Sequence, residues 1–208
     1  KWVLKRVGEA HPRADEPEFD GTRDVLIFGL ENQSLALARQ LAGHGWDVRI
    51  ASRRTETGTV DVRMPGVEIV GIDSLEPSCL KKLELHRFEA VVTLLDDHEN
   101  LKICEMVYEN VGTRLVVVHL HDHANAERFR ELGAVPVEPG TAFVGLLDHM
   151  VRSPAATAMM LGLDREQDVQ EIEVRSELLE GKALRDLDLP VEALVLSVVR
   201  DRRQSVSH

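Results

Sequence analysis

The feature of the sequence that most limits its fold is a regular alternation of short apolar runs with helix-like segments. Continuous apolar runs are typical of strands buried on both faces of a parallel sheet, and parallel strands need helical crossovers. The predicted strands lie at residues 25–28, 48–51, 67–70, 90–95, 115–120 and 135–137, and the predicted helices at 34–42, 99–110 and 124–132. We therefore expect an α/β fold, a doubly wound parallel sheet with its ligand crevice at the C-terminal strand ends.

The composition is that of a globular chain with an acidic surface. Among 208 residues there are 25 Lys and Arg against 36 Asp and Glu, and the net charge of −11 disfavours binding to nucleic acid. The two cysteines, Cys79 and Cys104, are too few for a disulfide framework or a cysteine zinc site, and they favour a reducing compartment. No apolar run approaches the roughly 20 residues that a membrane-spanning helix needs.

Changes in composition divide the chain into four segments. Residues 1–23 carry prolines and many acids, which indicates a linker from an upstream element. Residues 24–150 form the predicted Rossmann-like domain, and residues 151–166 are expected to be connecting or dimer helices. Residues 167–208 predict part of a small α+β domain, with strands at 169–174 and 193–200, a helical turn at 181–187 and a polar end.

Residues 141–151 form an unusually apolar helix candidate, which is followed by Pro154 and a second helix of small residues. A helix that covers a sheet needs only one apolar stripe. Burial in the core and packing against a second copy of the chain both explain the excess, and the sequence leaves the two interpretations open.

The first predicted strand ends in a glycine turn that opens a helix, an arrangement that binds the pyrophosphate of dinucleotides. That chemistry uses three glycines, but the stretch reads Gly29-Leu30-Glu31-Asn32-Gln33-Ser34 and keeps only the first. Glu31 places a negative charge where a phosphate would lie, at a cost of up to about 3 kcal/mol for two charges roughly 5 Å apart. An adenine nucleotide, another small anion and an empty crevice all remain open.

The second predicted strand ends in Ser52-Arg53-Arg54 instead of the acid that usually holds the ribose of a dinucleotide. Arginine side chains can bind a phosphate through two parallel hydrogen bonds. The site therefore favours a 2′-phosphorylated or otherwise anionic ligand, unless it is vestigial.

Three histidines alternate at the end of the fifth predicted strand. His119, His121 and His123 share one face if the chain stays extended, which is a spacing that suits metal ligands. The alternative is that His121 and Asp122 begin a turn that directs the third histidine elsewhere. A pH-sensitive histidine cluster is a further interpretation, because these side chains titrate near neutrality.

Catalytic signatures are not found in the sequence. There is no Gly-x-Ser-x-Gly elbow, no Walker loop and no second large domain to hold a substrate over a nicotinamide. We therefore expect a protein that is not an enzyme.

Five stretches follow one another in a fixed order: residues 25–54; Gly71 with Asp73 and Leu80; residues 90–97 followed by Glu99-Asn100; Asn125-Ala126-Glu127-Arg128-Phe129 with Glu131-Leu132-Gly133-Ala134; and the tail at 171–174 and 179–187. Together they resemble the RCK (KTN, Trk-type) family of cytoplasmic ligand-sensing domains, found in potassium channels, Trk and Ktr uptake systems and cation:proton antiporters. The resemblance covers about residues 24–203.

The resemblance implies a crevice that binds an adenine nucleotide: NAD(H) or NADP(H), ATP or ADP, or AMP. Glu31, Ser52 and His119 depart from the family pattern, and His119 stands where an arginine often reaches the phosphate. A divalent cation is the second ligand that we expect. The implied binding residues are Gly29, Leu30, Glu31, Asn32, Ser34, Ser52, Arg53, Arg54, Asp73, Ser74, Thr93, Asp96 and His119.

The resemblance also implies how such a domain works. It would form a homodimer or a higher ring at the inner face of the membrane, where residues 1–23 would descend from a membrane-embedded cation transport domain in the same parent chain. Ligand binding would gate a potassium channel, a potassium transporter or a cation:proton antiporter. The alternatives are an NAD(P)-dependent oxidoreductase-like protein and a constitutive assembly domain without a ligand.

Overall fold

The computed structural model describes residues 23–53, 64–112, 115–162, 182, 186, 197–200 and 203–206. The chain divides into two compact units, Lys1–Arg152 and Ser153–His208. The predicted linker before residue 23, Arg54, the predicted strand at 169–174 and nearly all of the helical turn at 181–187 lie outside the described residues. Among the described helices, none has both the length and the apolar character needed to cross a bilayer.

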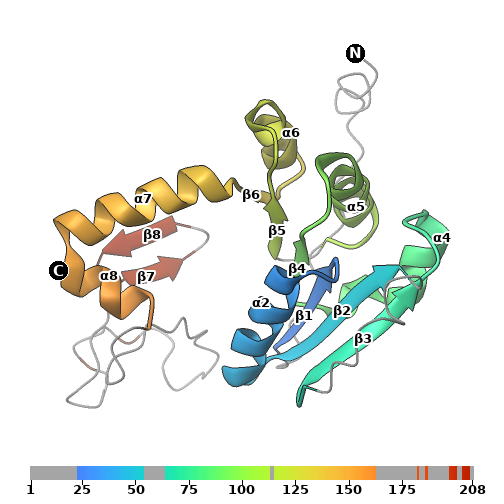
Figure 1. Ribbon diagram of the computed structural model, residues 1–208, viewed down its shortest axis with the longest axis horizontal. Helices are drawn as coiled ribbons and strands as arrows, with labels where there is room; N and C mark the ends of the chain where they lie inside the picture. Colours follow the sequence, from blue (N-terminus) through green and yellow to red (C-terminus); the bar gives the residue numbers. More distant parts are fainter. Residues whose placement is uncertain are drawn as a thin grey trace. The chain divides into compact units, whose positions relative to one another are not determined.

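A six-stranded parallel sheet forms the centre of the first unit, in the order β3-β2-β1-β4-β5-β6 (Figure 1). Its strands are β1 (Asp24–Phe28), β2 (Asp47–Arg53), β3 (Val67–Ile72), β4 (Ala90–Thr93), β5 (Leu115–His119) and β6 (Val135–Val137). The order of the strands reverses between β1 and β4, which makes their C-terminal ends the switch point of a doubly wound sheet. The predicted fold class is confirmed.

The helices of the first unit are α2 (Asn32–Gly43), α4 (Pro77–Leu80), α5 (Asp97–Asn110), α6 (Ala126–Glu131) and α7 (Pro139–Arg152). The first unit also contains three 3₁₀ turns: Lys81–Leu83, Leu85–Arg87 and His123–Asn125. The sequence analysis missed α4 and the two turns after it, because each is too short to show a helical period. Glu84, with φ of 51°, separates those two turns.

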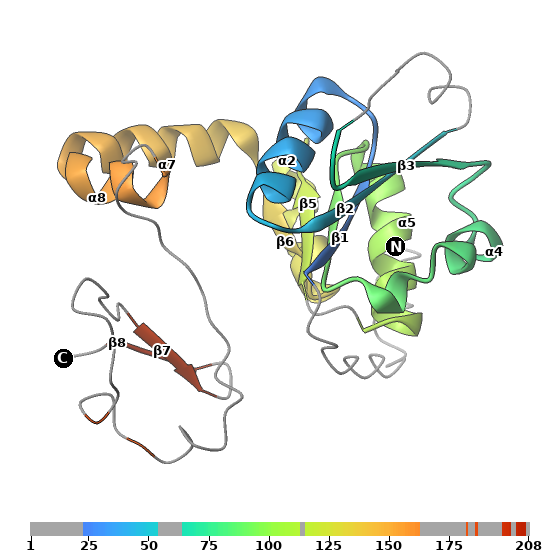
Figure 2. The same ribbon diagram turned by 90° about the horizontal axis from the view of Figure 1, so that it is seen from below.

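The sheet has an apolar layer on each face. On one face, α2 packs through Ala38 against Val25, Ile27 and Ile50. On the other face, α4, α5 and α6 cover a second cluster that is centred on Phe28 and Val91. Figures 1 and 2 show the strands lying between α2 and α5. Alternate residues of β1 therefore reach different layers, and this explains why its apolar run is continuous.

The β5–β6 end of the sheet is less well covered on the α2 face. Val117 faces the α2 layer, and the parallel register pairs it with Val135 and pairs His119 with Val137. Leu115, Val135 and Val137 on this face are 44%, 48% and 38% exposed. Among the described residues, this end of the sheet thus presents an open apolar strip, defined here as Leu115, Val135 and Val137.

No residue of α7 is buried. Phe143, Val144 and Val151 are 59%, 65% and 83% exposed, and Leu147 and Met150 complete an apolar stripe along one side of the helix. Of the two sequence interpretations, the described residues exclude burial of α7 in the core of its own unit.

The second unit contains α8 (Pro154–Met160) and an antiparallel pair, β7 (Ser197–Arg200) and β8 (Arg203–Val206). The prediction of a strand at 193–200 is confirmed for its last four residues. The sequence analysis described the end of the chain only as polar; in the structure Val206 pairs with Ser197 and Arg203 with Arg200. A polar strand at a sheet edge gives little alternation for sequence analysis to detect.

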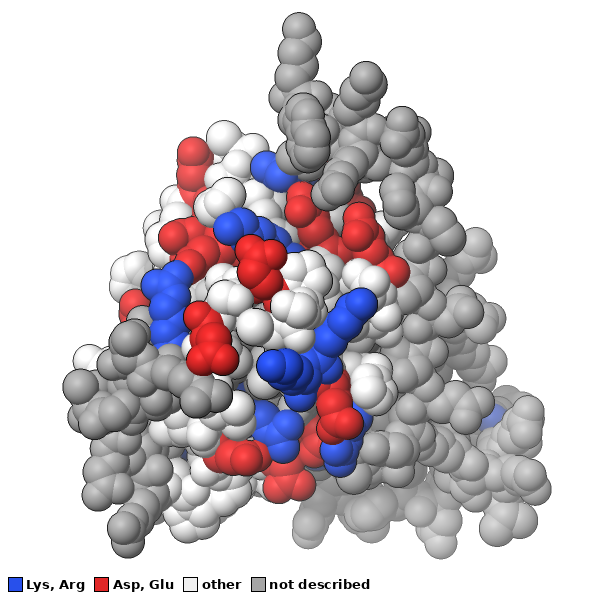
Figure 3. All heavy atoms as spheres, turned by 90° about the vertical axis from the view of Figure 1, so that its right-hand side faces the viewer, with Lys and Arg blue, Asp and Glu red and all other residues white. Residues whose placement is uncertain are grey.

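Charged side chains of both signs are interspersed on the face shown in Figure 3, over the part of the chain that the structure describes. The structure also contains ion pairs on strands and turns: Arg49 contacts Glu68 at 2.8 Å, and Arg87 contacts Glu84 at 3.0 Å. A mixture of this kind has no continuous basic surface to attract a phosphate backbone.

The two cysteines should differ strongly in reactivity. Burial, and then the charge of Glu105, raise the pKa of the Cys104 thiol to about 12, whereas Cys79 is partly exposed. Because the thiolate is the reactive species, we expect iodoacetamide at pH 8 to label Cys79 and to leave Cys104 unmodified in the folded protein. Peptide mass spectrometry measures this, and unfolding in urea should make the two labelling rates similar. Equal labelling without denaturant would contradict the buried position of Cys104.

Candidate functional site

Gly29 forms the turn at the switch point, directly after β1. Its φ is 108°, and its N–H donates to the Ala51 carbonyl oxygen at 3.0 Å. An added Cβ would lie 3.4 Å from Leu95 Cδ2 and 3.6 Å from the Leu94 carbonyl oxygen. These are ordinary contact distances, so it is the backbone conformation, with its positive φ, that requires glycine here.

Glu31 is the N-cap residue of α2, in the place where a dinucleotide fold has a second glycine. Ser34, in the place of the third glycine, is buried, and its Oγ accepts a hydrogen bond from the Glu31 N–H at 3.3 Å. Asn32, the first residue of α2, is exposed, whereas Leu30 packs into the α2 layer. The N-terminus of α2 attracts anions, but the chain places its own carboxylate there.

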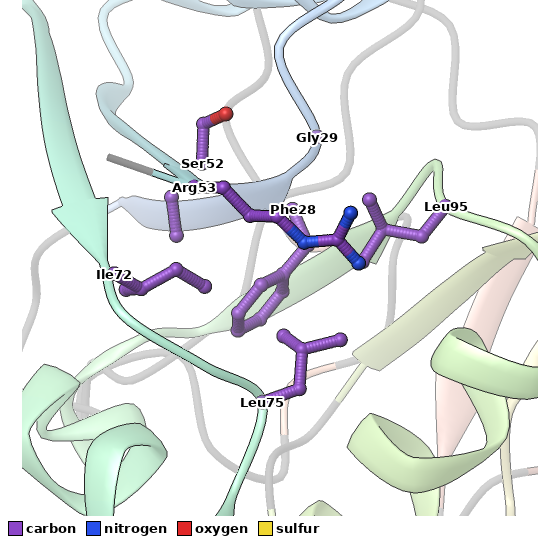
Figure 4. A pocket seen from close by; sticks show the side chains of 8 residues that line it. Phe28, Gly29, Ser52, Arg53, Ile72, Leu75 and Leu95 are labelled. Atoms are coloured by element: carbon purple, nitrogen blue, oxygen red, sulfur yellow. The ribbon is translucent and has the colours of Figure 1, made fainter. Parts of the chain in front are cut away.

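A shallow pocket, partly open to solvent, lies beside this turn (Figure 4). Its enclosed space is only about 30 Å³, far below that of small-molecule sites, so a ligand would rest mainly on the open mouth of the pocket. The lining is mostly apolar and is formed by Phe28, Gly29, Ala51, Ser52, Arg53, Ile72, Leu75 and Leu95. Sequence analysis did not identify five of these as pocket residues, because an apolar residue at a strand end cannot be distinguished by sequence from a residue of the hydrophobic core. They are Phe28, Ala51, Ile72, Leu75 and Leu95.

Arg53 is the charged residue of this lining. In Figure 4 its side chain passes over Phe28 and extends toward Leu95. Its Nη2 donates to Glu99 Oε1, so the guanidinium joins the end of β2 to the first turn of α5. Ser52 is buried at the end of the same strand. The structure therefore places both residues in the lining of the pocket.

The predicted residues after β3 and β4 have mainly structural contacts. Ser74 Oγ donates to Cys79 Sγ and accepts from the Glu76 N–H, both at 3.4 Å, and neither Ser74 nor Asp73 is among the residues that line the pocket. Asp96 is the N-cap of α5 and accepts from the Glu99 N–H at 2.9 Å. Thr93 is fully buried at the end of β4, and its Oγ1 has no hydrogen-bond partner among the described residues.

Asp97 holds the loop that follows β5. Its carboxylate accepts hydrogen bonds from the N–H groups of His121 and Asp122, both at 2.9 Å, and from Asn125 Nδ2 at 2.8 Å. Burial raises the pKa of Asp97, but these hydrogen bonds and the His121 ring outweigh it and leave the pKa below its ordinary value. The sequence analysis did not single out Asp97, because its partners lie more than twenty residues away along the chain.

Asn100 connects the ends of β4 and β5 in the same region. It is fully buried, and its Nδ2 donates to the carbonyl oxygens of Leu95 at 2.8 Å and His119 at 2.9 Å. Its Oδ1 accepts from the Leu95 N–H at 3.2 Å. One amide side chain thus fixes the backbone at the ends of two neighbouring strands.

His119 lies beside His121, with ring centroids 4.1 Å apart. Burial, and then the charge of His121, lower the pKa of His119, while the carboxylates of Asp97 and Glu31 act in the opposite direction. A lowered pKa keeps this imidazole neutral near pH 7. His119 therefore does not supply the positive charge of the arginine that the family resemblance places here.

The three histidines do not converge. His121 Nδ1 lies 3.3 Å from Asp97 Oδ1, whereas His123 Nδ1 lies 3.1 Å from Glu138 Oε2. In the described part of the chain, no three His, Cys, Asp or Glu side chains are arranged to hold a metal ion. The geometry thus gives no support to the metal site predicted at His119, His121 and His123, because the strand ends at His119 and the next residues turn away.

The model of one protein family, the TrkA-N domain, matches residues 25–137, which span the whole sheet. The chain belongs to the TrkA-N domain family. The predicted resemblance to RCK domains is thereby confirmed.

Relatives of this TrkA-N domain include the Trk system potassium uptake protein TrkA homolog of Archaeoglobus fulgidus, which is 26% identical over 181 residues, 86% of this chain. The match covers 41% of that relative, so the chain spans less than half of its length. The NAD(P)-binding domain of an exopolyphosphatase-related protein of Archaeoglobus fulgidus is 25% identical, with a TM-score of 0.52 over 62% of this chain and 96% of that one.

A structure of the GsuK channel bound to NAD shares the fold of the TrkA-N domain. It is 22% identical, and the TM-score is 0.52 over 70% of this chain and 26% of that one. The likeness supports the doubly wound architecture described above.

Proposed function

We propose that this TrkA-N domain is a ligand-sensing regulatory domain of a monovalent cation transport protein, that it acts at the cytoplasmic face of the membrane and that it catalyses no reaction. The observation that carries the proposal is the pocket beside Gly29 and the start of α2, at the switch point of the sheet. The relative named for potassium uptake supports the transport role. A cation:proton antiporter or a potassium channel is the proposed parent.

The ligand that we propose for the pocket is an adenine nucleotide. Phe28, Ile72 and Leu75 offer apolar surface to a flat ring, and Arg53 can reach a phosphate on the ribose. The start of α2 fits the pyrophosphate less well, because Glu31 brings a like charge to it. The apolar lining and Arg53 therefore favour contact with the adenosine half of a nucleotide, whereas Glu31 weakens the binding of its phosphates.

The response that we propose is a change in the geometry of a homodimer or a larger ring. The apolar stripe of α7 and the open apolar strip on β5 and β6 are two exposed surfaces of the same unit, and a second copy of the chain would cover both. A nucleotide then acts only if it binds the two dimer geometries unequally. That difference would pull on the transport domain of the parent chain.

The test is binding of ADP, NADH and NADPH to the 208-residue chain, measured by thermal shift and calorimetry, with Glu31→Gly and Glu31→Gln as variants. We expect Glu31→Gly to bind about tenfold or more tightly, because removing one nearby like charge at the helix N-terminus is worth about 1–2 kcal/mol. Glu31→Gln keeps a side chain without the charge, so an equal gain in both variants identifies charge as the cause.

A flat response of all three proteins to all three nucleotides would contradict the proposed sensing role. It would favour the alternative of a constitutive assembly domain. Oxidation of NADPH in the presence of a substrate panel would contradict the non-catalytic part of the proposal.

A further inference from the structure

One charged pair crosses the mouth of the pocket. Arg53 Nη2 contacts Glu99 Oε1, and the two residues are 46 positions apart in the sequence. The Arg53 side chain is 56% exposed and that of Glu99 18%, so the acid is the more enclosed member. The backbone of Glu99 is also fixed, since its N–H donates to the Asp96 cap of α5 at 2.9 Å. The arginine is therefore the side of the pair that can move.

We propose that Glu99 is an internal competitor for Arg53 and that it makes the pocket selective for phosphorylated ribose. This inference rests on the proposed nucleotide-binding function. In the ligand-free domain, Glu99 holds the guanidinium across the pocket mouth. A ligand with a phosphate on its adenosine ribose binds by taking the guanidinium from Glu99.

The chemistry of the two partners favours the exchange. Glu99 contacts Arg53 through one oxygen, whereas a phosphate carries more charge and can accept two parallel hydrogen bonds from a guanidinium. An ion pair with an exposed member contributes little to the stability of the fold, so it can open without unfolding the domain. A ligand without that phosphate gains nothing from Arg53, so release of the guanidinium from Glu99 leaves its affinity nearly unchanged.

The chain offers a matched control on the same strand. Arg49 lies four residues before Arg53 on β2, about 13 Å away, and its Nε donates to Glu68 Oε2 at 2.8 Å. Neither Arg49 nor Glu68 lines the pocket. Glu68→Gln therefore breaks a comparable pair and removes the same charge away from the crevice.

The experiment is calorimetric titration of the 208-residue chain and of Glu99→Gln, Arg53→Gln and Glu68→Gln with NADPH and NADH. These two probes differ only by the 2′-phosphate. We expect Glu99→Gln to bind NADPH about threefold to tenfold more tightly and NADH with less than about a twofold change. Arg53→Gln should lose the preference for NADPH, and Glu68→Gln should match the unaltered chain.

Three results would overturn the inference. In the first, the unaltered chain binds NADPH and Glu99→Gln binds it no more tightly. This result shows that Glu99 does not compete for Arg53, and it leaves the proposed function standing. Equal gains for NADH and NADPH show general relief of negative charge and no exchange of partners. No binding of either probe by any of the four proteins overturns the proposed function together with the inference.

A ligand-free measurement tests the pair separately. The thermal midpoints of the unaltered chain, Arg53→Gln, Glu99→Gln and the double variant form a double-mutant cycle. We expect the double variant to lose less than the sum of the two single losses. Additive losses show that Glu99 does not hold Arg53 in solution, which overturns the inference.

Discussion

Replacement of Asp97 by alanine is expected to lower the free energy of unfolding by about 2 kcal/mol, because it removes the acceptor of several hydrogen bonds to one carboxylate. His121 N–H, Asp122 N–H and Asn125 Nδ2 lose their partner together. His121 and Asp122 are exposed, so water replaces part of what is lost. Urea unfolding, followed by circular dichroism, measures the change.

The effect should also depend on pH. The pKa of Asp97 is lowered in the folded protein from its ordinary value of 3.8, so the charged carboxylate stabilises the fold above that value. This stabilisation is lost as the pH falls through the lowered pKa. The difference in unfolding free energy between the unaltered chain and Asp97→Asn should therefore be constant above about pH 5 and shrink below about pH 4.

Asp122→Asn is a suitable control for this first prediction. In the described part of the chain, Asp122 Oδ1 accepts a hydrogen bond from the Ala124 N–H at 3.0 Å. The amide oxygen of asparagine can accept the same hydrogen bond. We expect a loss of less than about 1 kcal/mol. A loss from Asp97→Ala no larger than that of the control would show that Asp97 does not hold the loop after β5.

Two glutamates on the apolar stripe of α7 are expected to abolish most of the proposed homodimer. We expect Val144→Glu with Val151→Glu to weaken self-association by about a hundredfold or more, because each buried valine contributes about 1.5–3 kcal/mol and a carboxylate is costly to bury. The two positions are 65% and 83% exposed in the single chain, so the fold should tolerate the change. Sedimentation equilibrium measures the association.

The matched control for α7 places the same two charges on the other side of the helix. Ala142→Glu with His149→Glu has the same spacing of seven residues, and both residues are exposed. We expect this variant to associate like the unaltered chain. Equal weakening by the two variants would point to general charge repulsion, and a monomeric unaltered chain would contradict the proposed dimer.

The sheet was predictable from the sequence because parallel strands buried on both faces have continuous apolar runs. The strand predicted at residues 135–137 coincides with β6, and the helix predicted from Glu99 begins two residues later than α5, which starts at Asp97. The glycine turn was also predictable, because Gly29 follows an apolar run and precedes a helical period. Short elements such as α4 and β8 were missed, since a few residues do not establish a period.

The candidate site was only partly predictable. The positions of Gly29, Glu31, Ser52 and Arg53 follow from their order along the chain. The structure places Gly29, Ser52 and Arg53 in the lining of the pocket and Glu31 at the start of α2. The predicted use of His123 did not hold, since its ring contacts Glu138 and points away from the cluster of His119 and His121.

The sequence by itself determined the α/β class, the turn at Gly29 and the negative charge at the start of α2, because each depends on residues that are neighbours along the chain. Only the tertiary structure decided that Arg53 contacts Glu99, that Asp97 holds the loop at His121, and that α7 is left without a partner in its own unit. The first two features depend on which strand ends lie side by side in the sheet, and the third depends on what the rest of the unit leaves uncovered. Contacts between residues 24 to 46 positions apart leave no local pattern in the sequence.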